Sequence, residues 1–216
     1  MTAQAQDIRP DRRRARTRAA LLQAGQSLFA AQSVDAVSID DIVLAADVAK
    51  GSFYNHFADK DALAREVAVT VRGEVEAQVD LANAGVADPV MRMARAQAVV
   101  IRFAVRQPER VRAMTRLFAG ATLPNAPMNR GVRADIEAGL TAGRFRDLTV
   151  ETGVLMAMGV ATVAVSRVLE PEGATPAETL ARDLIFALLR GLGVEGAAAR
   201  AASLTAASDI FGEIRP

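Results

Sequence analysis

The chain has 216 residues, of which 51% are hydrophobic and 24% charged, a balance typical of a globular protein. Its formal net charge is +1, and it has no cysteine, which excludes disulfide scaffolds, thiolate metal sites and cysteine nucleophiles. The lack of cysteine fits a cytosolic location, and we expect no secretory signal in the arginine-rich start of the chain. The longest apolar run, residues 153–165, is too short to cross a membrane, so we expect a buried core helix there.

Apolar residues recur at helical spacing along the chain, which predicts an all-α fold of about nine or ten helices. A capping box at Ser38, with Asp41 three residues later, marks one helix start, and prolines at first-turn positions mark others. After a flexible tail over 1–10, helices are expected over about 11–32, from 38, over 50–57, 59–83, 89–107 and 108–118. A loop over 119–127 precedes helices from 128, from 147 or 149 to 169, from 175 to 192, and in the tail 195–216.

Residues 38–57 have the pattern of two short helices joined by a turn of about three residues. Phe53 and Phe57 lie one helical turn apart, so both are expected to face a small core. The other side of that helix is then polar, rich in hydrogen-bond donors and without carboxylates. A helix that enters the major groove of DNA needs this chemistry, because donors meet both phosphates and base edges.

A string of residues in this segment matches a known motif position by position: Lys50, Gly51, Ser52, Phe53, Tyr54, His56, Phe57 and Lys60. On this string the chain resembles the TetR family of transcriptional regulators, over about residues 15–65. The resemblance implies phosphate contacts to operator DNA from Ser38, Tyr54, His56 and Lys60. It places Lys50, Ser52 and Asn55 nearest the base edges, while Gly51 lets the backbone approach the DNA.

Arg12, Arg13 and Arg14 lie just before this motif and have two interpretations. One is a basic arm that reaches the neighbouring minor groove, as in other helix-turn-helix proteins. The other is a solvated flexible tail. In either case the predicted domains are a helix-turn-helix over 11–58 and an effector-binding and dimerisation domain over 59–216, with the helix at 59–83 as the link.

The larger domain carries the candidate effector and dimer residues. A flexible cavity for an apolar effector is expected at Phe103, Met114, Phe118, Met128 and Met156, although methionines more often fill gaps in a core. Two late helices are apolar on two sides, which predicts a four-helix dimer interface. Its candidate residues are Leu155, Met158, Thr162, Val165, Leu180, Leu184 and Leu188. The alternative is a central helix in a larger monomeric core.

These features together predict a repressor that binds a palindromic operator in double-stranded DNA as a homodimer and is released by a small, largely apolar effector. The same fold also suits an activator or an effector-independent regulator. A helical enzyme is disfavoured, because the sequence has no triad, metal cluster or phosphate loop, and His56 is its only histidine. No cofactor, metal or membrane partner is expected, and the location is cytoplasmic at the bacterial nucleoid.

Overall fold

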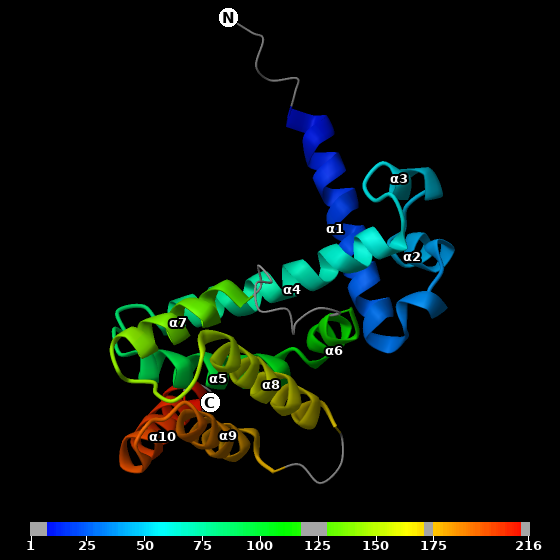
Figure 1. The fold of residues 1–216 in the computed structure, drawn as a ribbon. Helices are drawn as coiled ribbons and strands as arrows, with labels where there is room; N and C mark the ends of the chain where they lie inside the picture. The colour runs from blue at the N-terminus through cyan, green and yellow to red at the C-terminus, as the bar shows by residue number, and fades with distance from the viewer. Residues whose placement is uncertain (1–7, 118–128, 171–174, 213–216) are drawn as a thin grey trace, which may run out of the picture. The chain divides into compact units, whose positions relative to one another are not determined.

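The structure is a computed structural model that describes residues 8–117, 129–170 and 175–212 (Figure 1). Over these ranges the chain forms ten α-helices and a 3-10 helix and no strand, which confirms the all-α prediction. The helices are α1 (Ile8–Ala31), η1 (Val34–Ala36), α2 (Ile39–Ala45), α3 (Lys50–Tyr54), α4 (Lys60–Ala82), α5 (Pro89–Arg106), α6 (Pro108–Leu117), α7 (Arg130–Thr141), α8 (Val150–Leu169), α9 (Ala177–Gly191) and α10 (Gly196–Gly212). The expected loop over 119–127 lies outside the described residues.

The chain divides into two compact units. The first contains the residues up to Val71 and α6 from Glu109 onward, and the second contains Arg72–Pro108 and the rest of the chain. The sequence places a domain boundary near residue 58, whereas the compact first unit extends well into α4. The predicted tail is also shorter than expected, because α1 already begins at Ile8.

The first unit is a small helical core. Phe29, Phe53 and Leu63 are completely buried in it, one from each of three helices. Helix α6 belongs to the same core through Ala113, and the Arg110 guanidinium donates to the side chain of Gln26 over 3.2 Å. These contacts explain why α6 groups with the first unit although it is distant in sequence.

The second unit is built around α5, which contacts α7, α8, α9 and α10 (Figure 1). Asp88 begins α5 by accepting from the Val90 amide over 3.4 Å, and the core side chains of this helix include Met93 and Ile101. Helix α10 packs against α5 and α9. Its buried residues there include Ala199 and Ala206, whose small side chains let the helices lie close together. The predicted helix in the tail is thereby confirmed as part of this core.

Candidate nucleic-acid interface and cavity

A capping box begins α2 as the sequence predicts. The Asp41 amide donates to Ser38 Oγ over 3.1 Å, and the Ser38 amide donates to Asp41 Oδ2 over 2.9 Å. The Ser38 hydroxyl also donates to Asp41 Oδ2 over 2.6 Å, and these bonds lower the pKa of the Asp41 carboxyl. The proton of Ser38 is therefore already used within the helix cap, which the predicted phosphate contact of this hydroxyl did not take into account.

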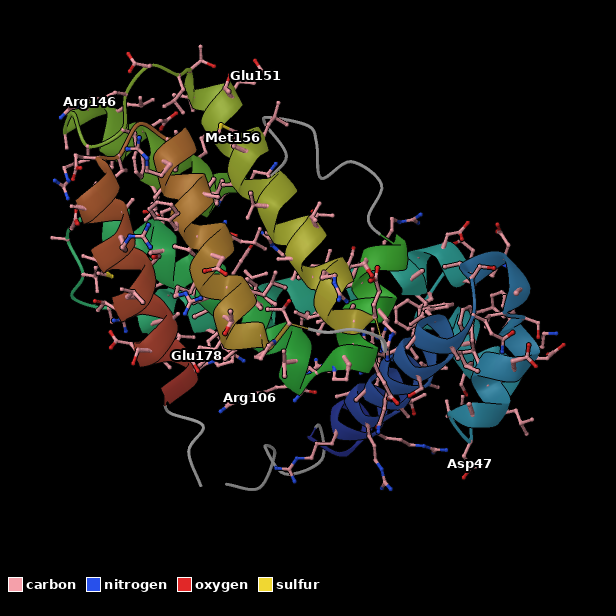
Figure 2. The ribbon with its side chains drawn as sticks, turned by 90° about the horizontal axis from the view of Figure 1, so that it is seen from below. Asp47, Arg106, Arg146, Glu151, Met156 and Glu178 are labelled. Atoms are coloured by element: carbon pink, nitrogen blue, oxygen red, sulfur yellow. The ribbon has the colours of Figure 1, made fainter. Side chains whose placement is uncertain are left out.

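The turn after α2 fixes the start of α3. Asp47 has φ 52°, in the left-handed region, and directs its side chain away from the turn (Figure 2). The Val48 amide donates to the Val43 carbonyl over 3.1 Å, and the Asp47 amide donates to the Leu44 carbonyl over 3.2 Å. This is a Schellman end with aspartate where glycine is usual. It turns the chain sharply between the two short helices, and Val48 packs against the core as expected.

Helix α3 faces its neighbours as the sequence predicts. Phe53 is completely buried and Phe57 is 4% exposed, although the helix ends at Tyr54 and Phe57 lies in the turn that continues it. The Phe57 amide donates to the Phe53 carbonyl over 2.9 Å, which keeps the two rings on one side. On the other side Gly51 and Asn55 are exposed.

Tyr54 combines a packed ring with an accessible surface. Its ring meets Phe53 edge-on at 5.5 Å, and the residue is 54% exposed. Ser52 and His56 are half-buried beside it. The hydroxyl and amide side chains of Ser52, Tyr54 and Asn55 thus lie on the face that a groove would meet.

This face has a carboxylate that sequence analysis did not place there. Lys50 Nζ lies 2.7 Å from Asp40 Oδ1, with both side chains more than half exposed. The hydrogen bond to Asp40 raises the pKa of Lys50. Asp40 stands in the first turn of α2, where a carboxylate also interacts favourably with the helix dipole. The expectation of a carboxylate-free surface is corrected, since the crossing of α2 and α3 brings these two residues together.

Lys60 has a different position from that expected of a phosphate ligand. Its ammonium donates to the carbonyl of Asp35 over 3.1 Å and to the carbonyl of Val37 over 3.2 Å. These bonds connect the first residue of α4 to the segment that precedes α2. In the structure Lys60 therefore stabilises the arrangement of the first unit.

Two arginines of α1, Arg14 and Arg18, lie near His56. Burial lowers the pKa of His56 below its usual 6.5, and the charges of Arg14 and Arg18 lower it further. Arg18 pairs with Glu66 and stacks over the Phe57 ring at 5.3 Å. Arg12, Arg13 and Arg14 are exposed and helical, so in this structure they belong to α1 rather than to an extended arm.

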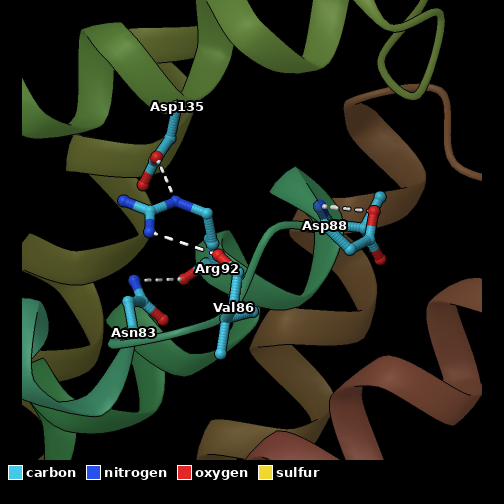
Figure 3. Close-up of polar contacts among 6 residues, drawn as sticks. Asn83, Val86, Asp88, Arg92 and Asp135 are labelled. Atoms are coloured by element: carbon cyan, nitrogen blue, oxygen red, sulfur yellow. Dashed lines mark hydrogen bonds and ion pairs between the residues drawn. The ribbon is translucent and has the colours of Figure 1, made fainter.

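The second unit contains a cavity of about 510 Å³. It is lined by the following residues of α4, α5, α7 and α8: Arg72, Val75, Glu76, Val79, Asp80, Arg92, Ala96, Gln97, Val100, Arg130, Gly131, Val132, Ala134, Asp135, Met158 and Ala161. Arg92 Nε donates to Asp135 Oδ1 over 2.7 Å and its Nη1 donates to the Val86 carbonyl over 3.4 Å (Figure 3). Asn83 Nδ2 donates to the Arg92 carbonyl over 3.2 Å, so the wall around this arginine is held from two sides.

Three of the predicted effector-pocket residues, Phe103, Met114 and Met156, are not among the residues that line this cavity. Phe103 is buried in the second unit, and Met114 belongs to α6 of the first unit. Met156 packs on Gly191 of α9, near the position that a Cβ there would occupy (Figure 2). Phe118 and Met128 lie outside the described residues. A site for the effector at these five residues therefore stays a prediction, separate from this cavity.

Helix α8 is apolar on both sides, and among the residues that the structure describes only one side is covered. Val154 and Val165 point into the subunit, whereas Leu155 is 39% and Val163 is 64% exposed. Over its most apolar stretch α8 has a mean hydropathy of 1.7, and 28% of that stretch is buried. By length and composition alone such a helix could cross a membrane, but here it packs against α5, α7 and α9. Within one subunit the expected core helix is therefore buried on one side, and burial of its other side by a partner stays a prediction.

The predicted dimer residues divide into two groups. Val165 and Leu188 are 4% and 2% exposed within the subunit, so neither offers a surface to a partner. Leu155 and Thr162 are exposed, and the half-buried residues are Met158, Leu180 and Leu184. Among the described residues no group of histidine, cysteine, aspartate and glutamate is placed to hold a metal ion.

Comparisons with known proteins agree with this geometry. The model for bacterial regulatory proteins of the tetR family matches residues 21–67. RolR without ligand is 26% identical over 86% of this chain and 95% of its own, with a TM-score of 0.63. A gamma-butyrolactone receptor (ArpA-like protein) is 22% identical over 93% of this chain and 98% of its own, with a TM-score of 0.64. The tetR regulator tylp from Streptomyces fradiae is 20% identical over 93% and 99%, with a TM-score of 0.67. No curated sequence gives a significant match.

Proposed function

Because this chain belongs to the tetR family of bacterial regulatory proteins, which are DNA-binding transcription regulators, we propose that it is a ligand-responsive repressor. It binds a palindromic operator as a homodimer and leaves the DNA when a small molecule occupies the second unit. The observation that carries this proposal is the arrangement of α3, with Phe53 and Phe57 buried behind a donor-rich exposed face. Regulation rather than catalysis is the activity we assign.

On this face the proposed DNA contacts fall into two classes. Tyr54 and His56 serve phosphates, and Lys50, Ser52 and Asn55 serve base edges, because their side chains are exposed or half-buried along the same face. Gel retardation with the DNA upstream of the gene tests the assignment. Tyr54→Phe should weaken binding to all sequences, whereas Asn55→Ala should change the preferred bases. Unchanged mobility at low salt would contradict DNA binding, and an unchanged site preference in Asn55→Ala would contradict the facing of α3.

The proposed dimer uses the uncovered side of α8. Leu155 and Val163 leave an apolar surface exposed there, and contiguous surfaces of this kind usually mark an interface. A second copy of the chain, related by a two-fold axis, would bury this surface, and the same symmetry matches a palindromic operator. Sedimentation should give a dimer for the wild type and a monomer for Val163→Lys. A monomeric wild type would contradict the proposal.

The proposed effector site is the cavity of the second unit. RolR has been solved in complex with resorcinol, and another similar structure is a gamma-butyrolactone receptor, so small molecules are ligands of proteins with this fold. Part of the cavity wall is the second half of α4, whose first half belongs to the unit with α3. A ligand that favours one placement of α4 shifts the population of states that fit the operator.

An activator, or a regulator without effector, has the same DNA-reading face. A reporter gene behind the bound site separates these alternatives. Repression relieved by a compound that also raises the melting temperature supports the ligand-responsive repressor. Expression that increases when the protein is added identifies an activator instead.

A further inference from the structure

The cavity of the second unit has chemistry that restricts what can occupy it. We infer that its ligand is a neutral molecule with an apolar body and a hydroxyl group, and that the hydroxyl donates to the side-chain oxygen of Gln97. This inference rests on the proposed function only in calling the occupant an effector. It makes the largely apolar effector expected from the sequence more specific.

Gln97 provides the hydrogen-bond acceptor. It stands on α5, lines the cavity and is 3% exposed. Its Nε2 donates to the Ala157 carbonyl of α8 over 3.1 Å. Since a carbonyl accepts only from a donor, this bond determines which end of the amide is nitrogen.

The other end of the same amide is then an acceptor without a partner. Gln97 Oε1 has almost no accessible surface and receives no hydrogen bond from any described residue, so a ligand hydroxyl reaches this atom only after a small movement of the cavity wall. A buried acceptor left in this state costs free energy, and a donor supplied by a ligand removes that cost. A hydroxyl or N–H group is therefore the feature that the site selects, and a hydroxyl is the smallest group that supplies it.

The charges of the lining argue against an ionised ligand. Its three arginines, Arg72, Arg92 and Arg130, are matched by Glu76, Asp80 and Asp135. Arg72 Nε lies 2.9 Å from Glu76 Oε1, and Arg92 Nε lies 2.7 Å from Asp135 Oδ1. Because these cations already face carboxylates, a ligand carboxylate would lose its hydration and meet balanced charge in return. A neutral ligand avoids that cost.

The apolar part of the cavity wall determines the size and polarity of the rest of the ligand. Apolar side chains from four helices contribute to it: Val75 and Val79, Ala96 and Val100, Val132, and Met158 and Ala161. The volume of about 510 Å³ lies within the range of small-molecule sites, roughly 300–1,000 Å³. An aromatic or alicyclic ring fits this wall, with its hydroxyl directed to Gln97.

The test uses matched compounds on the full chain without DNA. Phenol, fluorobenzene and benzoate form one set, 2-naphthol, 2-fluoronaphthalene and 2-naphthoate a second, and cyclohexanol, fluorocyclohexane and cyclohexanecarboxylate a third. Each set keeps the ring and changes only the donor or the charge. Melting temperature and titration calorimetry at up to millimolar ligand report binding to the wild type and to Gln97→Leu. Gln78→Leu, on α4 outside the cavity lining, is the matched control.

In at least one set the hydroxyl compound should bind about tenfold more tightly than its fluoro analogue, the effect of one hydrogen bond. Gln97→Leu should reduce this preference to less than about threefold, and Gln78→Leu should keep it. The inference is overturned if carboxylates bind most tightly, if fluoro and hydroxyl compounds bind equally, or if no hydroxyl compound binds. The first comparison needs only the wild type, so a variant that fails to fold does not prevent a decision.

Gel retardation on the same protein separates this inference from the proposed function. A protein that retards its upstream DNA but binds no hydroxyl compound overturns the ligand class alone. A protein that binds hydroxyl compounds through Gln97 but no DNA overturns the regulator proposal and leaves the ligand class standing.

Discussion

Lys60→Met separates two roles for a residue of the motif. The motif implies a phosphate contact, whereas the structure shows the Lys60 ammonium on the carbonyls of Asp35 and Val37, at 3.1 and 3.2 Å. Methionine keeps the unbranched apolar stem and removes only the charged donor. The substitution therefore removes these two hydrogen bonds with little change in packing.

The expected cost follows from those bonds. A hydrogen bond from a charged group contributes about 1.5–3 kcal/mol when buried, and Lys60 is half-buried. Water can hydrogen-bond to the carbonyls of Asp35 and Val37 once the ammonium is gone, which offsets part of the lost free energy. We therefore expect Lys60→Met to reduce the free energy of unfolding by about 1–2 kcal/mol for the two bonds together.

Two measurements decide between the roles. Urea unfolding gives the free energy, and DNA affinity at several salt concentrations gives the slope of log K against log salt. A lost phosphate contact would reduce that slope by about 0.9, while a structural role leaves the slope unchanged. Arg65→Met is the matched control, because it removes an exposed charge of the same helix. Unchanged stability with a reduced slope in Lys60→Met would refute the structural role.

Four further predictions concern other residues of the two units. Asp40→Asn releases Lys50 from its ion pair for its proposed contact with a base edge, so gel retardation should show tighter binding and a changed preference for bases; an unchanged affinity and base preference would show that Lys50 meets no base edge. The pKa of His56 is lowered by folding, so its contribution to stability is complete above pH 6.5 and lost below that value, toward its folded pKa. Urea unfolding between pH 7.5 and 5.5 should show this decrease in the wild type and much less of it in His56→Gln. Gly139→Ala would put a Cβ 2.1 Å from the buried Phe145 ring and should cost about 1–3 kcal/mol. Gly73→Ala, in open space within α4, should stabilise the chain by about 0.5–1 kcal/mol in the same denaturation assay.

Local signals in the sequence were sufficient for the helices and for the facing of α3. The capping box at Ser38 and the four-residue spacing of Phe53 and Phe57 act within one or two helical turns. Such signals can be evaluated without knowing where any other segment lies. The exposed Gly51 and Asn55 then follow from geometry, since they lie opposite the buried rings.

The residues that sequence analysis misplaced depend on contacts between segments. Asp40 meets Lys50 only because the left-handed residue at Asp47 sets the crossing of α2 and α3. Lys60 is a second case, because it donates to carbonyls that lie more than 20 positions earlier in the chain. The cavity is a similar case, because residue type indicates what fills a core and not where a space remains. Gln97 gave no signal of its own, since an isolated glutamine in a helix is usually exposed.

Helix α8 shows why composition predicts an uncovered surface better than it predicts which residues form it. Two apolar stripes require two partners, and the stripes of a helix with 3.6 residues per turn overlap where they meet. Val165 is among the predicted interface residues and is 4% exposed, whereas Val163 is not among them and is 64% exposed. The contacts of α8 with α5, α7 and α9 determine which of its residues are buried. The exposed residues of α8 can be identified only once these contacts are known. Val163 and Val165 are two positions apart, a rotation of roughly 200° at 3.6 residues per turn, so they lie on nearly opposite sides of α8. Val163→Lys is therefore the substitution that tests the dimer, and Val165→Lys tests only the core.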